Sequence, residues 1–124
     1  MTASEKSKKL IDLLHTRTSE RKLEWRTGDS AESVYIWFGD RRLELSEGSN
    51  SNGEPLEILT IINANGDLVE KITDESFGSD PVMEGFGNFW LLMSATRDRA
   101  YKQSIGAEDA IDDIINELGD DIPF

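Results

Sequence analysis

The sequence predicts an α+β fold in which one helix precedes an antiparallel sheet and two helices follow it. Apolar residues recur at helical spacing near the start of the chain, alternate with a period of two from residue 21 to 72, and return to helical spacing after residue 85. The links between the alternating segments are too short for helical crossovers, so neighbouring strands run antiparallel. We expect a single domain over residues 1–124, with a meander of about five strands and helices packed mainly on one face of the sheet.

The first part of the chain is predicted to form one helix and three strands. The helix covers residues 4–18, where Leu10, Ile11 and Leu14 form a narrow apolar stripe. Apolar and polar residues then alternate in three segments, which are predicted to be strands at residues 22–26, 32–38 and 42–45.

A loop and a second hairpin complete the predicted sheet. Residues 46–55 contain nothing except Gly, Ser, Asn, Glu and Pro. No side chain in this stretch offsets the entropy that is lost on ordering, so the stretch is predicted to be a flexible loop. Strands follow at residues 56–62 and 68–72, and the Asn- and Gly-containing residues 63–67 between them predict a hairpin turn.

Two helices are predicted after the sheet. The first covers residues 86–104 and begins properly only near Asn88, because Gly85 and Gly87 each weaken its first turn by about 1 kcal/mol relative to Ala. The second covers residues 107–118 and has a regular apolar face formed by Ile111, Ile114, Ile115 and Leu118. Residues 120–124 are expected to form a loose tail.

The charge of the chain is strongly negative and unevenly distributed. Thirteen basic and twenty-five acidic residues give a net charge of −12. Residues 1–26 carry a net charge of +3, whereas residues 106–124 contain seven acids and no base. Such a field disfavours direct contact with nucleic acid or an anionic membrane, and it favours a basic protein partner. The alternative is that acidity only keeps the protein soluble.

The composition excludes several classes of site. The chain has no cysteine, which excludes disulfides, thiolate metal sites and cysteine nucleophiles. Its apolar runs are far shorter than the ~20 residues of a membrane-spanning helix, and its first residues lack the apolar core of a signal peptide. We therefore expect a soluble cytoplasmic protein.

The sequence contains no familiar catalytic or metal-binding pattern. His15 is the only histidine, and its pairing with Asp12, three residues earlier, is common on protein surfaces. Asn63, Asn65 and Gly66 resemble part of a calcium loop. The ligand positions that require carboxylates are isoleucines, however, and a hairpin turn explains the same residues. We expect no catalytic residue, no bound metal and no cofactor.

Arg97 and Arg99 form a basic pair on the predicted long helix. Such a pair could hold an anion. Several carboxylates nearby in the sequence offer ordinary salt-bridge partners instead, and they favour an ion-pair role: Asp74, Glu75, Asp80 and Asp98.

Two groups of residues are candidates for binding a partner. Tyr35 and Trp37 lie in a segment that is apolar on both faces, which a sheet covered on one side does not require. Either helices cover both faces, or this face meets a protein partner or a second copy of the chain, since aromatic residues are enriched at interfaces. The second group forms the outer arc of the last helix, as a solvated surface or as a docking face for a basic protein: Asp109, Asp112, Asp113 and Glu117.

Three features of the sequence resemble a loose group of small uncharacterised bacterial proteins. Residues 18–25 correspond to a T-x-x-G-K-L-x-W start, residues 63–66 to an N/D-x-x-G hairpin, and residues 92–99 to a C-terminal helix that carries an Arg. Glu20–Arg21 stands where the group tends to have Gly. The resemblance implies a bacterial protein that folds as a helix, a Trp-containing strand meander and C-terminal helices. It implies no catalytic residues.

These observations favour a non-catalytic protein–protein interaction module of the adaptor, immunity-protein or inhibitor type. The prediction depends on the acidic surface, the aromatic residues of the sheet and the lack of a catalytic pattern. One alternative is a small-ligand-binding domain or enzyme, with a pocket between the sheet and the helix at residues 86–101. Another is an inhibitor whose carboxylates mimic the phosphates of nucleic acid.

Overall fold

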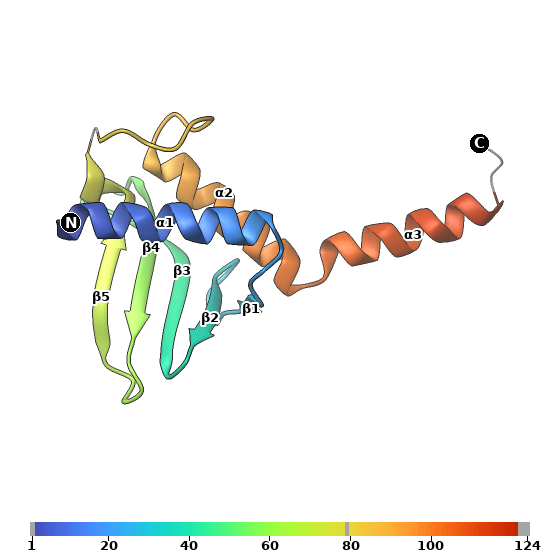
Figure 1. Ribbon diagram of the computed structural model, residues 1–124, viewed down its shortest axis with the longest axis horizontal. Coiled ribbons are helices and arrows are strands. Elements are labelled where there is room, and N and C mark those ends of the chain that lie inside the picture. Colours follow the sequence, from blue (N-terminus) through green and yellow to red (C-terminus); the bar gives the residue numbers. More distant parts are fainter. Residues whose placement is uncertain (1, 79, 122–124) are drawn as a thin grey trace.

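The computed structural model describes residues 2–78 and 80–121, and it confirms the predicted α+β fold (Figure 1). Three α-helices are present in this part of the chain: α1 (Ala3–Ser19), α2 (Phe89–Ser104) and α3 (Ala107–Asp121). Five strands form one sheet: β1 (Arg26–Thr27), β2 (Val34–Phe38), β3 (Arg41–Ser49), β4 (Pro55–Ile62) and β5 (Leu68–Thr73). A short 3₁₀ helix, η1 (Asp74–Phe77), follows β5.

The sheet is an antiparallel meander, as predicted. Its strands lie in the order β1-β2-β3-β4-β5, and every neighbouring pair is antiparallel. The turn between β4 and β5 is the predicted hairpin. The side-chain oxygen of Asn63 accepts hydrogen bonds from the backbone N–H groups of Asn65 and Asp67, each at 3.0 Å. Gly66 has a φ of 84° in this turn, which glycine adopts without a steric clash.

Side-chain caps fix where the first two helices begin. The Thr2 hydroxyl accepts a hydrogen bond of 3.1 Å from the Glu5 backbone N–H at the start of α1. The Asn88 side chain accepts a hydrogen bond of 2.8 Å from the Leu91 backbone N–H. α2 therefore begins directly after Asn88, which confirms the predicted start of that helix.

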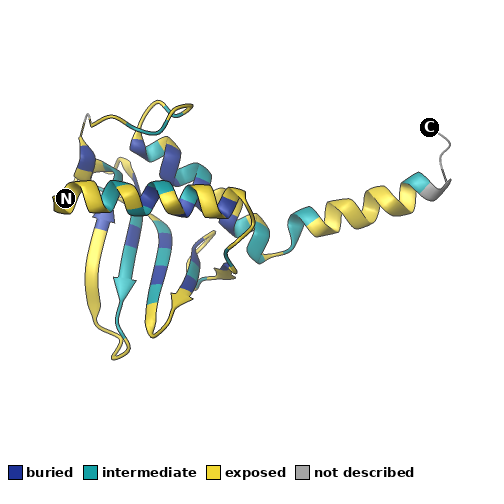
Figure 2. Cartoon of the chain, in the orientation of Figure 1, coloured by how far each residue is buried: buried dark blue, intermediate teal, exposed yellow. Residues whose placement is uncertain are grey.

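The core lies between the sheet and the two helices that cover one of its faces, α1 and α2 (Figures 1 and 2). α2 packs against α1 and also contacts β1, β2 and β4. The indole of Trp25 donates a hydrogen bond of 3.0 Å to the Thr18 hydroxyl, which fastens the chain before β1 to α1. The buried sheet and α2 side chains include Val34, Ile36, Leu43, Leu45, Leu59, Ile72, Leu92 and Met93.

Two predictions about strand boundaries are wrong. Residues 46–49 do not begin a loop but continue β3, because they pair in register with β4. The turn that remains is closed by Asn50, whose side-chain oxygen accepts hydrogen bonds from the backbone N–H groups of Asn52 and Glu54. Of the strand predicted at residues 22–26 only Arg26 is in a strand, because β1 covers Arg26–Thr27 and is the only part of this segment that pairs with β2.

The last helix, α3, extends away from the body that the sheet forms with α1 and α2 (Figure 1). It is longer than predicted and continues through Gly119 to Asp121, so residues 120–121 of the expected loose tail are helical. Residues 122–124 of that tail lie outside the described residues. None of the described helices is both long enough and apolar enough to cross a membrane.

Candidate functional site

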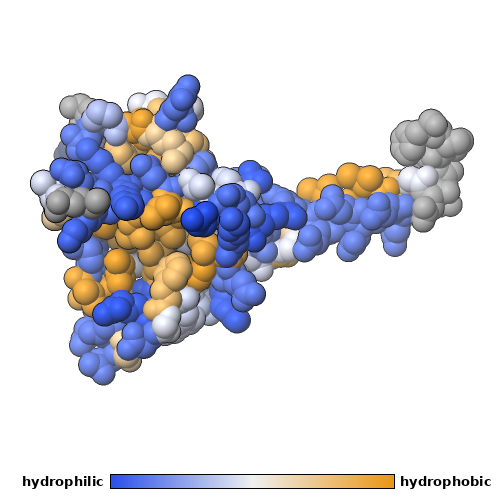
Figure 3. Space-filling view, in the orientation of Figure 1, coloured by the Kyte–Doolittle hydropathy of each residue, from blue (hydrophilic) through white to orange (hydrophobic). Residues whose placement is uncertain are grey.

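An apolar stripe runs along α3 and faces solvent. Four side chains form it at positions i, i+3, i+4 and i+7, and each is between 55% and 57% exposed: Ile111, Ile114, Ile115 and Leu118. Every residue from Asp109 to Leu118 is exposed, so no described element covers the stripe. Figure 3 shows it as a continuous apolar band along one side of the helix. We call these four residues the α3 stripe.

The four acidic residues that were predicted to form a docking face on this helix lie outside the α3 stripe. Asp109, Asp112, Asp113 and Glu117 are exposed and are spread over the rest of the helix circumference, with Asp112 and Glu117 beside the stripe and Asp109 and Asp113 opposite it. They do not converge on one point, so they do not form a metal site. Together with the stripe they make α3 strongly amphipathic, with an apolar side and an acidic side (Figure 3).

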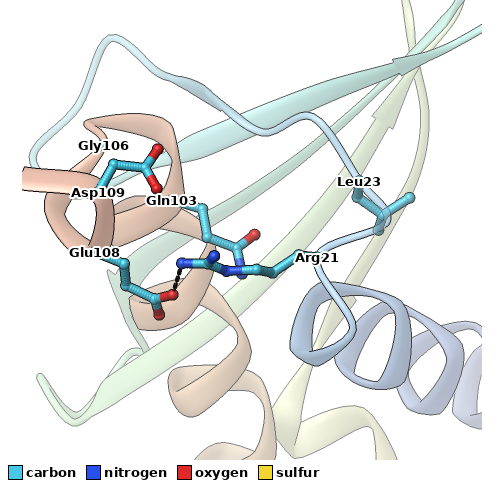
Figure 4. Close-up of a pocket in the computed structure, with 6 residues that line it drawn as sticks. All are labelled: Arg21, Leu23, Gln103, Gly106, Glu108 and Asp109. Atoms are coloured by element: carbon cyan, nitrogen blue, oxygen red, sulfur yellow. Dashed lines mark hydrogen bonds and ion pairs between the residues drawn. The ribbon is translucent and has the colours of Figure 1, made fainter. Parts of the chain in front are cut away.

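Ion pairs fix the base of α3 against the body. The Arg21 guanidinium binds the Glu108 carboxylate, and Arg99 approaches the same carboxylate at 3.9 Å. The Gln103 side chain donates a hydrogen bond of 2.8 Å to the backbone oxygen of Thr18 at the end of α1. Figure 4 shows Arg21 pointing toward Glu108 across a hollow of about 200 Å³. The two contacts of Glu108 hold the first turn of α3 to the body, and the Gln103 hydrogen bond joins α2 to α1 beside it.

A second apolar surface lies on the body, along α1 and the end of β2. It consists of two adjoining hollows of about 480 Å³ and 230 Å³, which share Leu10 and Phe38. Leu13 and Phe38 are 43% and 45% exposed there. Figure 3 shows apolar side chains gathered on this face below α1. We call this surface the α1 groove; its apolar lining is Leu10, Leu13, Leu14, Leu23, Phe38, Leu43 and Ile61.

The charged side chains at the edge of the α1 groove are mainly basic. Arg17 and Lys22 line the larger hollow, and Arg41 lines the smaller one. Arg17 and Lys22 share one acid, Glu20, at 2.9 Å and 3.6 Å. One carboxylate between two cations leaves a net positive charge at this edge, which is opposite to the charge of α3.

Tyr35 and Trp37 lie on the face of the sheet opposite α1 and α2. Trp37 is 51% exposed, so the interpretation that helices cover both faces of the sheet is wrong for this residue. Tyr35 is half-buried because the Arg42 guanidinium stacks on its ring, 4.1 Å from the ring centroid. This pair of aromatic residues and the acids of α3 are thus carried by separate elements and do not form one site.

Arg97 is buried inside the protein and forms ion pairs with carboxylates of the sheet. Its side chain is 4% exposed and donates two hydrogen bonds of 2.9 Å to the Glu57 carboxylate on β4. Arg97 also binds the Glu47 carboxylate on β3 and donates a hydrogen bond of 3.2 Å to the backbone oxygen of Glu32. The predicted ion-pair role is confirmed, but the partners come from the sheet and not from the acids near Arg97 in sequence.

The pKa values of both partners of this buried pair are raised, but for different reasons. Hydrogen bonding to Glu57 raises the pKa of the Arg97 guanidinium, so this group stays charged. Burial raises the pKa of the Glu57 carboxyl, and Arg97 opposes that rise. With its donors used by Glu57, Glu47 and Glu32, Arg97 is a structural cation and is not available to an external anion.

His15 joins α1 to α2. Its Nδ1 lies 3.1 Å from the Thr96 hydroxyl oxygen, and that hydroxyl donates to the backbone oxygen of Leu92 at 2.8 Å. The imidazole therefore donates from Nδ1. The ring also meets Phe86 edge-on, with 4.9 Å between the ring centroids. Burial lowers the pKa of His15, and the nearby charge of Arg99 lowers it further.

The described residues offer little room for a ligand between α2 and the sheet. The hollow found there, beside Met93 and Thr96, has a volume of about 10 Å³, which is about the space of one water molecule. Within residues 2–78 and 80–121, no three His, Cys, Asp or Glu side chains come together in a way that could hold a metal ion.

The α1 groove is the feature that sequence reasoning missed. Leu10 and Leu13 lie on one side of α1, apart from the buried Ile11, and their spacing was a signal of this surface. The sequence does not show, however, which strand lies beside them.

Comparisons with protein families, with curated proteins and with solved structures find no match to this chain.

Proposed function

We propose that the protein is a non-catalytic protein–protein interaction module and that α3 is its main contact element. The observation that carries this proposal is the α3 stripe, four large aliphatic side chains that are more than half exposed on a helix extending from the body. Contiguous apolar surface of this kind is typical of sites that bind another protein.

The geometry of α3 is that of a helix that binds in a groove. Such helices place anchor side chains at positions i, i+3, i+4 and i+7, as the α3 stripe does. Burying one Leu or Ile side chain contributes about 1.5–3 kcal/mol, so four such side chains can support a specific complex after the costs of association. The acids beside the stripe favour a partner with a basic rim.

The interior of the protein supports an interaction role over a ligand pocket. The buried side chain of Arg97 is fully engaged by Glu57, Glu47 and Glu32. The hollow between α2 and the sheet is too small for a substrate. Among the described residues the larger hollows are open surface features, and they lie along α1, at the base of α3 and beside Trp37.

Affinity capture with matched baits tests this function. The full-length protein, an Ile115→Asp variant and a Leu91→Asp variant would each be used to capture proteins from the lysate of the source cells. Leu91 is the matched control, because it is 45% exposed on α2, outside the α3 stripe and the α1 groove. We expect a stoichiometric protein, either another chain or the protein itself, that Leu91→Asp retains and Ile115→Asp loses.

Two results would contradict the proposed function. In the first, the Ile115→Asp bait captures the same proteins in the same amounts as the full-length protein. In the second, the protein proves to have a turnover activity that a single acid substitution abolishes.

In the capture experiment, washing at low and at high salt distinguishes a contact made by the acids of α3 from one made by its apolar stripe.

A further inference from the structure

We propose that the partner of α3 is a second copy of this chain: the α3 stripe of one copy docks in the α1 groove of the other, and the two contacts form reciprocally. This inference rests on the proposed function and names the occupant of the same surface. It accounts for two exposed apolar surfaces with one kind of contact.

The apolar surfaces match in kind and in extent. The α3 stripe extends over two helical turns, from Ile111 to Leu118. The α1 groove continues across two adjoining hollows, from Leu13 on α1 to Ile61 on β4. Docking would bury the stripe together with Leu13 and Phe38, two of the exposed large apolar side chains of the body.

The charges of the two surfaces are opposite. Arg17, Lys22 and Arg41 stand at the edge of the α1 groove, with Glu20 shared by the first two. The helix that would enter carries four exposed acids on its outer arc and no basic residue: Asp109, Asp112, Asp113 and Glu117. A helix with acidic flanks in a groove with a basic edge gains attraction at the rim while its apolar side is buried.

The base of α3 favours a second copy over the chain's own groove. Arg21 and Arg99 hold Glu108, and α3 points away from α1 in that arrangement (Figures 1 and 4). To reach its own groove, α3 would have to reverse at Gly106 and give up these ion pairs. α3 can reach the groove of a second copy while its direction and the ion pairs of Glu108 stay unchanged.

Reciprocal exchange also closes the assembly. In a two-fold dimer each copy offers one helix and one groove, so both helices and both grooves are occupied and no surface is left to recruit a third copy. The fifteen residues of α3 span about 22 Å at 1.5 Å per residue, which lets the helix reach across to a neighbouring body.

Sedimentation velocity of the full-length protein tests this inference. We expect a concentration-dependent dimer, and we expect Ile115→Asp in the stripe and Leu13→Asp in the groove each to weaken dimerisation by about tenfold or more. Leu91→Asp should leave the dimer unchanged. Because Ile115, Leu13 and Leu91 are all about half exposed, these variants are expected to fold; circular dichroism of each checks that they do.

A mixing experiment identifies which surfaces meet. Ile115→Asp keeps its groove and Leu13→Asp keeps its stripe, so a mixture of the two can form one native contact that neither variant forms alone. We expect the mixture to associate more strongly than either component. A mixture no heavier than its components would overturn the pairing of stripe with groove.

Other outcomes are equally decisive. A full-length protein that stays monomeric at all concentrations would overturn the dimer. A dimer that Leu13→Asp leaves intact would overturn the docking of stripe in groove, because that result indicates pairing between two α3 helices. Neither result would contradict the proposed function if the Ile115→Asp bait still loses a different protein in the capture experiment. The two proposals therefore fail separately.

Discussion

The carboxylate of Glu57 and the guanidinium of Arg97, forty positions apart in the sequence, form a two-hydrogen-bond ion pair in the interior of the protein. Glu57 is 1% exposed and Arg97 is 4% exposed. The pair joins β4 to α2. Since it is removed from water, each partner depends on the other for the stability of its charge.

Arg97→Met is expected to lower the free energy of unfolding by about 3–5 kcal/mol at neutral pH, because it leaves Glu57 as an unpaired buried carboxylate. Burial already raises the pKa of Glu57, so the carboxyl will take up a proton as the pH falls. The loss should therefore shrink under acidic conditions. Urea unfolding at several pH values measures both effects, and the double variant Glu57→Leu/Arg97→Met should be more stable than Arg97→Met alone. Equal losses in the two variants would contradict this account of the pair.

Arg21 occupies a position that favours glycine. It follows the last turn of α1 with a φ of 58°, and the backbone N–H groups of Arg21 and Lys22 close the helix on Thr18 and Arg17. The left-handed conformation costs a non-glycine residue about 1–2 kcal/mol. Arg21→Gly should therefore be more stable than the matched variant Arg21→Ala by about 1 kcal/mol. Both variants lose the ion pair with Glu108, so a comparison of their thermal or urea unfolding isolates the backbone effect.

His15 should make the stability depend on pH below neutrality. Burial and the charge of Arg99 lower its pKa in the folded protein, whereas Asp12 opposes this shift. As the pH falls below about 6.5, the ordinary pKa of histidine, the unfolded chain takes up the proton first, so stability is full above that pH and declines below it. The loss should not exceed about 1 kcal/mol, because the ring is partly exposed. Urea unfolding at a series of pH values from neutral down to about 5 should show this slope, and His15→Gln should abolish it.

The two tryptophans of the N-terminal half should differ sharply in their contributions to stability. Trp37 is 51% exposed, and Trp37→Ala should lower the free energy of unfolding by less than about 1 kcal/mol. Trp25 is 5% exposed and is hydrogen-bonded to Thr18, and Trp25→Ala should lower it by about 3–5 kcal/mol. Chemical unfolding of both variants measures the difference. A large loss for Trp37→Ala would mean that its ring is covered.

The parts of the fold that the sequence predicted well are those governed by local rules. The side chain of Asn88 sets the start of α2, and the turn at residues 63–67 needs only its own Asn and Gly. The end of β3 is different. Residues 46–49 have the composition of a loop, yet they form strand because β4 lies beside them and accepts their pairing. Pairing between distant segments can override local propensity.

The candidate site shows the same division. The spacing of Ile111, Ile114, Ile115 and Leu118 predicted an amphipathic helix, and the helix is present. That its apolar face would remain uncovered depends on the direction in which α3 leaves Gly106, which no local pattern encodes. The partners of Arg97 were likewise misjudged, because Glu57 and Glu47 reach it through the register of the sheet and not through proximity in sequence.

The exposure of α3 has a consequence for how tightly any partner binds. A single helix of fifteen residues is only marginally stable in water unless something packs against it. The coil-to-helix equilibrium of α3 therefore contributes directly to the binding equilibrium. Residues on the side of the helix that the partner does not touch also change the affinity, because they change the stability of the helix. Asn116 lies on that side and is exposed; replacing it with alanine, a stronger helix former, would tighten the complex without altering a single intermolecular contact.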